Sequence, residues 1–259
     1  MKAVILAGGL GTRLSEETAD KPKPMVEVGG KPILWHIMKI YSMHGVNEFI
    51  ICCGYKGYIL KEYFYNYALH NSDASFNLKE KSFSLNRNSS EEWTVHCVDT
   101  GLNTQTGGRL KRIQDYIDDE TFLFTYGDGV GDIDISKTIK NHKKSKKIAT
   151  ITAVSPPGRF GALKINDITN EVEIFEEKPQ KGNTWINGGF FVLEPEVFNY
   201  ISGDNMPWED EPLKNITKER QLNCYKHDGF WQPMDTIREK SILNQLYLNG
   251  EAPWKIWED

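Results

Sequence analysis

A glycine-rich stretch that directly follows a short apolar run constrains this 259-residue chain more than any other feature. Residues 3–6 are apolar, include β-branched side chains and are bounded by glycine, which indicates a buried strand. Gly8, Gly9 and Gly11 then allow the backbone to turn sharply and to approach a ligand, because they carry no Cβ atom. Successive amide N–H groups in such a loop form a concavity that suits anionic oxygens.

Cationic side chains accompany this loop. Arg13 lies inside it, and Lys21 and Lys23 come just beyond it. A strand, a bare backbone turn and nearby cations together predict a site for a phosphate chain. The sequence leaves one alternative to a phosphate site open: the segment is only a tight strand-to-helix turn, and its cationic side chains are solvated.

Two common phosphate-binding motifs do not match. A P-loop requires Gly-Lys-Ser/Thr after its glycines, whereas Gly11 is followed by Thr12 and Arg13. A dinucleotide-binding fingerprint requires a third glycine for helix packing and an acidic residue near the end of the second strand. Neither is present, since residues 52–54 are Cys-Cys-Gly.

The composition limits the classes of protein to which this chain can belong. A net charge of −5 with 26% charged residues suits one α/β domain with a sizeable core and no nucleic-acid partner. The chain shows neither a transmembrane run nor a signal peptide, so we expect a cytoplasmic protein without a membrane partner. The cysteines lack Cys-x-x-Cys spacing and suit buried thiols in a reducing compartment: Cys52, Cys53, Cys97 and Cys224.

The first half of the chain alternates strands and helices. A helical apolar stripe spans residues 32–44, with Pro32 suited to its first turn. A strand at 49–53 and a helix at 58–69 follow, and another strand spans 121–126. This spacing predicts βαβ crossovers and a parallel sheet.

A polar, serine-rich excursion at residues 71–92 interrupts this alternation, and we expect an exposed hairpin or flap there. The second half is richer in strands, which suggests mixed or antiparallel pairing; the expected strands are 148–154, 162–165, 172–175 and 190–193, and the expected helices are 194–201 and 234–248. We expect one domain over residues 1–259, whose first half at 1–135 carries the phosphate site and whose second half at 136–259 faces the substrate.

Two aspartates are candidate metal ligands. Asp128 follows the strand at 121–126 and is flanked by glycines, so it lies where ligands bind open α/β sheets and can hold Mg²⁺. An Asx turn is the alternative. Asp235 is the second candidate, and a helix N-cap is its alternative role.

The glycine-rich loop resembles that of the sugar-phosphate nucleotidylyltransferases. Residues 8–14 match their Gly-Gly-x-Gly-Thr-Arg-Leu pattern, and residues 22–24 match their Pro-Lys-Pro. Many members carry proline where this chain has Glu16, which leaves the path of residues 15–19 open, although Thr18 matches. The resemblance implies a Rossmann-like, doubly wound, mixed but mostly parallel sheet, with a small antiparallel sugar-binding portion.

The resemblance also assigns residues. Asp128 and Asp235 match the family's metal-binding aspartates, in Tyr-Gly-Asp-Gly and Trp-x-x-x-Asp-Thr, and the resemblance alone pairs them on one Mg²⁺. Residues 175–179 match a Phe-x-Glu-Lys-Pro stretch, which implies that Lys178 holds the sugar phosphate and Glu177 the sugar hydroxyls. Asn187 and Gly188 are further sugar-site candidates, with a β-bulge as the alternative. The role of Arg159 stays open between sugar and solvent.

In the implied reaction, Arg13 stabilises the leaving pyrophosphate and Lys23 neutralises the α-phosphate, with Asp128 as the third catalytic residue. The resemblance also implies that Thr104, Gly108 and Arg109 lie near the base and triphosphate. An ordinary loop before a helix, without a binding role, explains these residues nearly as well. The expected nucleotide-binding residues are Leu6, Ala7, Gly8, Gly9, Gly11, Thr12, Arg13, Lys23, Thr104, Gly108, Arg109 and Gly127.

Several longer stretches look specifically like the bacterial members that use CTP and glucose 1-phosphate: 35–45, 49–57, 156–162, 186–192 and 230–236. They imply the products CDP-glucose and pyrophosphate, a role in 3,6-dideoxyhexose and O-antigen synthesis, and a homo-oligomer such as a hexamer. Uridylyl or thymidylyl transfer, a catalytically silent nucleotide-sugar-binding subunit and a Rossmann oxidoreductase are the rival readings.

Overall fold

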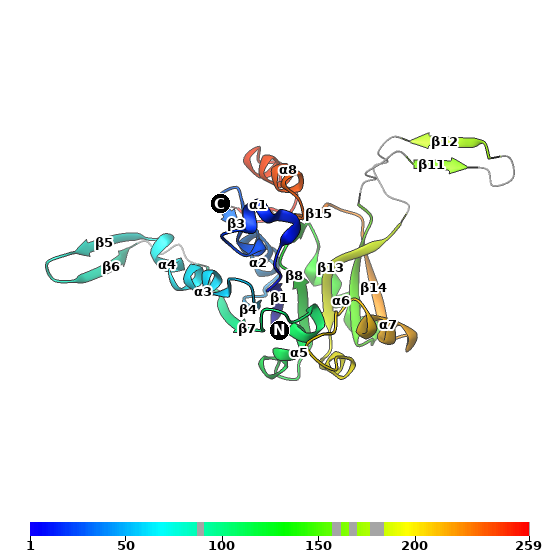
Figure 1. The fold of residues 1–259 in the computed structure, drawn as a ribbon, viewed down its shortest axis with the longest axis horizontal. Helices are drawn as coiled ribbons and strands as arrows, with labels where there is room; N and C mark the ends of the chain where they lie inside the picture. Colours follow the sequence, from blue (N-terminus) through cyan, green and yellow to red (C-terminus); the bar gives the residue numbers. More distant parts are fainter. Residues whose placement is uncertain (87–90, 157–161, 166–169, 177–183, 259) are drawn as a thin grey trace.

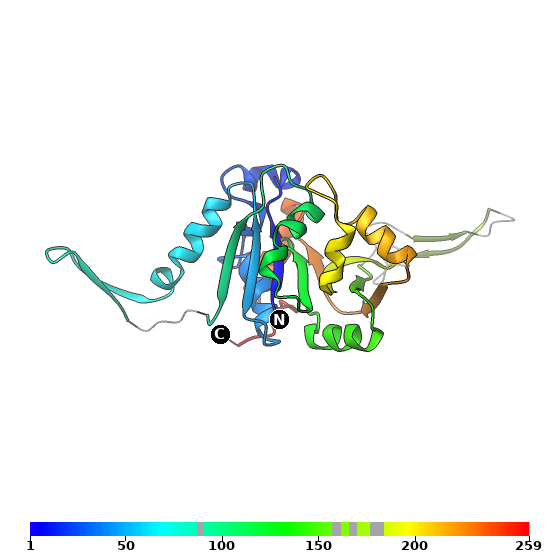
Figure 2. The ribbon, with the colours of Figure 1, turned by 90° about the horizontal axis from the view of Figure 1, so that it is seen from below.

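The computed structural model describes residues 1–86, 91–156, 162–165, 170–176 and 184–258. Its centre is a seven-stranded sheet with the order β14-β10-β13-β8-β1-β4-β7 (Figure 1). The strands of this sheet are β1 (Ala3–Ala7), β4 (Glu48–Cys53), β7 (Thr94–Asp99), β8 (Phe122–Tyr126), β10 (Ala149–Val154), β13 (Ile186–Leu193) and β14 (Leu222–His227). Helices lie on both of its faces (Figure 2).

The helices and short pairs surround this sheet. The α-helices are α1 (Ser15–Thr18), α2 (Ile33–Ser42), α3 (Gly57–Tyr65), α4 (Tyr67–His70), α5 (Thr106–Arg112), α6 (Ile135–Ser145), α7 (Glu211–Lys218) and α8 (Ile237–Leu248). The 3₁₀ turns are η1 (Thr12–Leu14), η2 (Lys23–Met25), η3 (Gln114–Tyr116) and η4 (Pro195–Tyr200). The paired short strands are β2 (Glu27–Val28) with β3 (Lys31–Pro32), β5 (Asp73–Asn77) with β6 (Ser82–Asn86), β9 (Gly129–Gly131) with β15 (Trp231–Pro233), and β11 (Ala162–Ile165) with β12 (Val172–Glu176).

The strand directions confirm the predicted mixed, mostly parallel sheet. β1 runs parallel to both β4 and β8, and β4 runs parallel to β7. β13 runs antiparallel to β8 and to β10, while β10 and β14 are parallel. The chain moves from β1 outward to β4 on one side, whereas β8 lies on the other side of β1. The carboxyl ends of β1 and β8 therefore form a topological switch point, where open α/β sheets bind ligands.

Strand β1 divides the core into two layers. Ala3 and Ile5 face the layer that contains α2 and α8, and Val4 and Leu6 face the layer that contains α5 and α7. Because successive strand residues point to opposite faces, a strand covered on both sides must be apolar at every position. This explains the uninterrupted apolar letters of residues 3–7, all of which are buried.

The predicted helix at residues 32–44 is α2, with Pro32 as its N-cap and Gly45 in the left-handed region after its end. The expected helix at 58–69 divides at Asn66 into α3 and α4. The expected helix at 194–201 is the 3₁₀ turn η4. Three elements of the second half, α7, β14 and β15, were not among the expected elements, and α6 buries only Ile135, Thr138 and His142.

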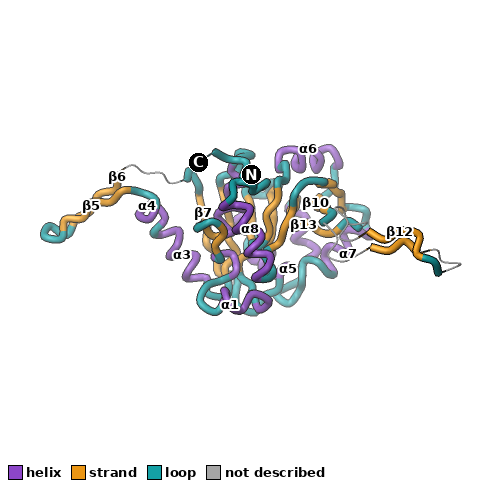
Figure 3. Tube along the Cα trace, turned by 90° about the horizontal axis from the view of Figure 1, so that it is seen from above, coloured by secondary structure: helices purple, strands orange, loops and turns teal. Residues whose placement is uncertain are grey.

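Two hairpins extend from opposite sides of the body (Figure 3). β5 and β6 pair in the serine-rich region, with Phe76 opposite Phe83 and both side chains largely exposed. β11 and β12 form the other hairpin. None of the described helices is both long and apolar enough to cross a membrane.

Candidate active site

A cleft of about 350 Å³ opens at the carboxyl ends of β1 and β8. It is lined by Leu6, Ala7, Gly8, Gly9, Gly11, Thr12, Arg13, Lys23, Pro24, Thr104, Gln105, Thr106, Arg109, Tyr126, Gly127, Asp128 and Asp235. The structure thus brings together every residue of the expected nucleotide site except Gly108. A Cβ atom at Gly108 would lie 2.5 Å from the carbonyl oxygen of Asp204, so this glycine packs against the loop at Asp204 rather than lining the cleft.

The glycine-rich loop closes on itself through a short turn. Gly11 adopts φ +66°, a conformation that favours glycine, and is followed by η1, in which the N–H of Leu14 donates to the carbonyl of Gly11. The hydroxyl of Thr18 lies 3.0 Å from the carbonyl oxygens of both Gly11 and Leu14. Residues 15–18 form α1, which resolves the chain path that Glu16 had left open.

Arg109 holds the glycine-rich loop against the loop after β7. Its Nη1 donates to the hydroxyl of Thr100 at 2.9 Å and to the carbonyl of Gly101 at 2.7 Å. Its Nη2 donates to the carbonyls of Gly8 and Leu102 at 3.0 and 3.1 Å. Burial holds the pKa of this guanidinium below its usual range. In this arrangement Arg109 fixes the backbone of the cleft, and a Cβ atom at Gly8 would overlap its guanidinium.

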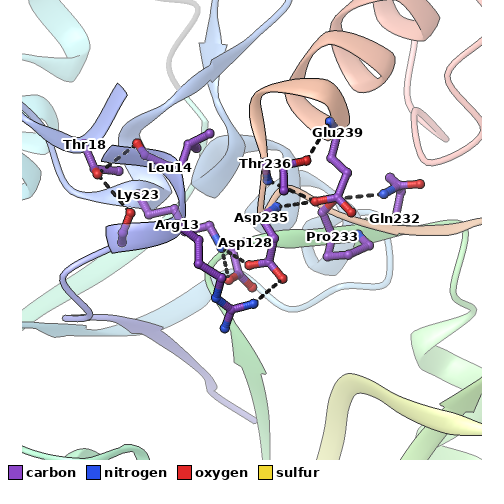
Figure 4. A network of polar contacts seen from close by, with 11 residues as sticks. Arg13, Leu14, Thr18, Lys23, Asp128, Gln232, Pro233, Asp235, Thr236 and Glu239 are labelled. Carbon is purple, nitrogen blue, oxygen red and sulfur yellow. Dashed lines mark hydrogen bonds and ion pairs between the residues drawn. The ribbon is translucent and has the colours of Figure 1, made fainter. Parts of the chain in front are cut away.

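Asp128 and Asp235 come together around one ammonium group (Figure 4). Lys23 Nζ lies 2.6 Å from Oδ2 of Asp128 and 2.5 Å from Oδ1 of Asp235. Arg13 Nη1 donates to Oδ2 of Asp235 at 3.0 Å. Burial by itself would lower the pKa of Lys23, but the two carboxylates outweigh it and hold the pKa above its usual range.

Helix α8 sets the position of Asp235. Thr236 is the N-cap of α8, and its side chain accepts a hydrogen bond from the N–H of Glu239. Glu239 Oε2 accepts from the N–H groups of Asp235 and Thr236 at 2.8 and 3.0 Å (Figure 4). Lys240 joins α8 to α1 through an ion pair with Glu17 at 2.6 Å. The helix N-cap considered for Asp235 is therefore Thr236, and the carboxylate of Asp235 points to Lys23 and Arg13 instead.

A short antiparallel pair brings the loops of the two aspartates together. β15 pairs with β9, so that Pro233 lies opposite Gly129. The N–H of Met234 donates to the carbonyl of Asp128 at 2.7 Å. Backbone pairing next to each aspartate thus holds two residues that are distant in the sequence at one place.

The sugar-site candidates lie beside the cleft or outside the described residues. Asn187, near the start of β13, donates from Nδ2 to the hydroxyl of Tyr126 at 3.3 Å and accepts from the N–H of Gly189 at 2.8 Å. The carbonyl of Gly188 accepts from the indole of Trp231 at 2.8 Å. The register of β10 and β13 shifts between Ile151 and Ala153, so a bulge is present at this point. Glu177, Lys178 and Arg159 lie outside the described residues.

Four residues that line the cleft were not predicted: Pro24, Gln105, Thr106 and Tyr126. Tyr126 ends β8, two residues before Asp128, and the Tyr-Gly-Asp-Gly stretch contained it. Its position at a strand end next to a candidate ligand was a signal that could have identified it.

The profile of the nucleotidyl transferase family matches residues 2–259, which is nearly the whole chain. This chain belongs to the nucleotidyl transferase family.

Curated relatives cover the full length. The glucose-1-phosphate cytidylyltransferase of Salmonella typhimurium is 59% identical over 259 residues, which are 100% of this chain and 100% of that protein. The probable glucose-1-phosphate cytidylyltransferase of Bacillus subtilis is 45% identical over 258 residues, covering 99% of this chain and 100% of that protein. The crystal structure of HddC from Yersinia pseudotuberculosis is similar in fold, with a TM-score of 0.66 and 23% identity, over 95% of this chain and 99% of that chain.

As a nucleotidyl transferase, the chain carries its glycine-rich loop and its aspartate of β8 at the sheet's switch point. The loop supplies backbone amides, and Arg13 and Lys23 supply cationic side chains beside them. Asp128 and Asp235 supply carboxylate oxygens, and both lie within hydrogen-bond distance of the Lys23 ammonium. This arrangement can hold phosphate groups between cations.

Proposed function

We propose that this chain transfers the cytidylyl group of CTP to α-D-glucose 1-phosphate, giving CDP-glucose and pyrophosphate. The observation that carries the proposal is the identity of 59% to a curated glucose-1-phosphate cytidylyltransferase over the whole of both chains. The cleft supports it, because the cations and carboxylates that phosphate transfer needs converge there.

The reaction must bring two polyanions, CTP and glucose 1-phosphate, close together. The sugar phosphate then attacks the α-phosphorus of CTP in line with the leaving pyrophosphate. Positioning and charge neutralisation supply most of the catalysis in such reactions. We assign Lys23 to the α-phosphate and Arg13 to the leaving pyrophosphate. The side chain of Arg13 is 77% exposed at the cleft, so it can reach a ligand without breaking buried contacts. Its planar guanidinium suits two phosphate oxygens at once.

The residues present fit Mg²⁺. Two carboxylates point at one place, and the ammonium of Lys23 already stands there as a cation between them. Mg²⁺ is commonly held by one or two carboxylates together with substrate phosphates. We propose that Asp128 and Asp235 hold the ion, which when bound supplies positive charge against the nucleotide phosphates and the attacking oxygen. Lys23 is the cation of this chain that we assign to the α-phosphate, and it would leave the two carboxylates to reach that group.

The remaining residues divide between two substrates. We assign the nucleotide to Leu6, Ala7, Gly8, Gly9, Gly11, Thr12, Thr104, Arg109 and Gly127; Arg109 also holds the backbone of this wall, and Gly108 packs behind it. We assign the sugar phosphate to Lys178, and the sugar hydroxyls to Glu177, Asn187 and Gly188. In this proposal residues 1–259 are one domain, whose 1–135 half mainly binds the nucleotide and whose 136–259 half mainly binds the sugar phosphate.

We also propose a cytoplasmic homo-oligomer that serves O-antigen dideoxyhexose synthesis, with a hexamer as the first form to test by sedimentation. The four unpaired cysteines support a reducing compartment. Exposed apolar side chains on the β5–β6 hairpin support an assembly contact there: Phe76, Leu78 and Phe83.

Pyrophosphate release tests the function. The protein is incubated with Mg²⁺ and glucose 1-phosphate, and CTP, UTP, dTTP and ATP are compared side by side. Release with CTP well above the others supports the proposal. Release with UTP or dTTP instead keeps the chemistry and overturns the nucleotide. No release with any of them favours the silent binding subunit, and turnover with NAD or NADP would favour the oxidoreductase.

A further inference from the structure

We propose that Glu209 is a positioning residue that joins the nucleotide wall of the cleft to the sugar wall, acting through the hydroxyl groups of Thr106 and Tyr126. The inference rests on the proposed function for the identity of the two walls. Glu209 itself does not line the cleft. Its carboxylate nevertheless binds two residues that do.

The two oxygens of Glu209 are divided between the walls. Oε1 accepts from the hydroxyl of Tyr126 at 2.5 Å, and Oε2 accepts from the hydroxyl of Thr106 at 2.6 Å. Hydrogen bonds to an ionised acceptor are about twice as strong as neutral ones. One carboxylate therefore couples the first residue of α5 to the last residue of β8.

The hydrogen bonds continue on both sides. Tyr126 accepts from Asn187 at the start of β13, where the sugar is assigned. Thr106 follows Thr104 and Gln105 along the cleft wall assigned to the nucleotide. A displacement of the Glu209 carboxylate would therefore move residues on both the nucleotide wall and the sugar wall of the cleft.

The carboxylate also decides which way the hydroxyls point. An ionised carboxylate only accepts hydrogen bonds, so Tyr126 must donate its proton to Glu209, and its remaining lone pairs face Asn187 and the cleft. A ligand therefore meets Tyr126 as a hydrogen-bond acceptor.

The backbone of Glu209 is held firmly while its carboxylate remains exposed. Trp208, the preceding residue, is fully buried against Phe124 and Phe191, and its N–H donates to the Thr106 hydroxyl at 2.8 Å. An exposed carboxylate contributes little to folding. A Glu209 variant should thus fold normally, which separates a positioning role from a structural one.

The test compares Glu209→Gln with Tyr126→Phe and with Asp210→Asn. Asp210 is the matched control, because it is the next exposed carboxylate and pairs with Lys214 on α7. We expect Glu209→Gln to raise KM for both CTP and the sugar phosphate by about tenfold, because the two walls are no longer held in register, while the unfolding midpoint stays near that of the wild type. Tyr126→Phe should raise KM mainly for the sugar phosphate, and Asp210→Asn should leave all constants unchanged.

A double-mutant cycle of Glu209→Gln with Tyr126→Phe completes the test. We expect the two effects to be less than additive, because each change removes the same hydrogen bond. Unchanged KM values in Glu209→Gln, fully additive effects, or a loss confined to stability would each overturn the proposal. CTP binding by calorimetry to the wild type and Glu209→Gln gives the same comparison without turnover, so failure of this inference is distinguishable from failure of the proposed reaction.

Discussion

Replacing Lys23 with methionine tests whether its ammonium stands in the metal site. Lys23 Nζ bridges Asp128 and Asp235 at 2.6 and 2.5 Å, and its side chain is only 12% exposed. Removing one partner of a buried ion pair costs about 3–5 kcal/mol, because the other charge stays buried and unpaired. The two carboxylates are 34% and 28% exposed, so water screens them in part, and we expect a loss of about 2 kcal/mol in unfolding free energy without metal.

The same reasoning predicts tighter metal binding by the variant. The ammonium and Mg²⁺ compete for the same two carboxylates, so the wild type must release Lys23 before the ion binds. Removing the competitor should strengthen Mg²⁺ binding by about the same 2 kcal/mol, or roughly thirtyfold. Saturating Mg²⁺ should then restore most of the lost stability. Turnover should be lost in both conditions, since Lys23 no longer reaches the α-phosphate.

Urea denaturation in EDTA and in Mg²⁺, together with calorimetry of Mg²⁺ binding, measures both effects. Lys21→Met is the matched control, because Lys21 lies in the same loop but pairs only loosely, 3.6 Å from Glu27. Its stability and metal affinity should stay near those of the wild type. Equal stabilisation of wild type and Lys23→Met by Mg²⁺ would refute the competition between lysine and metal.

Three further results are expected. Asp128→Asn should reduce turnover far more than the unfolding free energy; equal loss of both would remove the metal assignment. Burial lowers the pKa of His36 to about 4, so the unfolded state binds its proton more tightly and the protein should lose about 2 kcal/mol of stability from pH 7 to pH 5. Denaturation of His36→Gln measures this, and an unchanged pH slope would contradict it. Arg109→Met leaves the buried carbonyls of the cleft backbone without a donor and should cost about 3 kcal/mol, with weaker CTP binding. Arg112→Met breaks an exposed pair with Asp204, which water screens, so its unfolding midpoint should stay near that of the wild type in the same denaturation assay.

Local patterns predicted the framework well where burial makes the letters unambiguous. β1 is apolar at every position because both its faces are covered, and α2 carries an apolar stripe between a proline and a glycine. Elements with little buried surface left no such pattern. β14 lies at the edge of the sheet and the burial of its side chains alternates only weakly, so it was not predicted.

The sequence by itself determined the chemistry available to the cleft. A glycine-rich turn after β1 and an aspartate after β8 must lie at one edge of a parallel sheet, because parallel strands end on the same side. The motifs in these two segments, together with the motifs around Lys23 and Asp235, were enough to identify the family and its reaction.

Only the tertiary structure decided which of these groups touch. The pairing of β9 with β15 brings Asp235 to Asp128, and because Thr236 caps α8, the Asp235 carboxylate binds Lys23 instead. The Arg109 guanidinium donates to backbone carbonyls, and Glu209 accepts a hydrogen bond from Tyr126. Both contacts join residues that are distant in the sequence. Such contacts depend on the distances between packed elements, and no local pattern of residues records those distances.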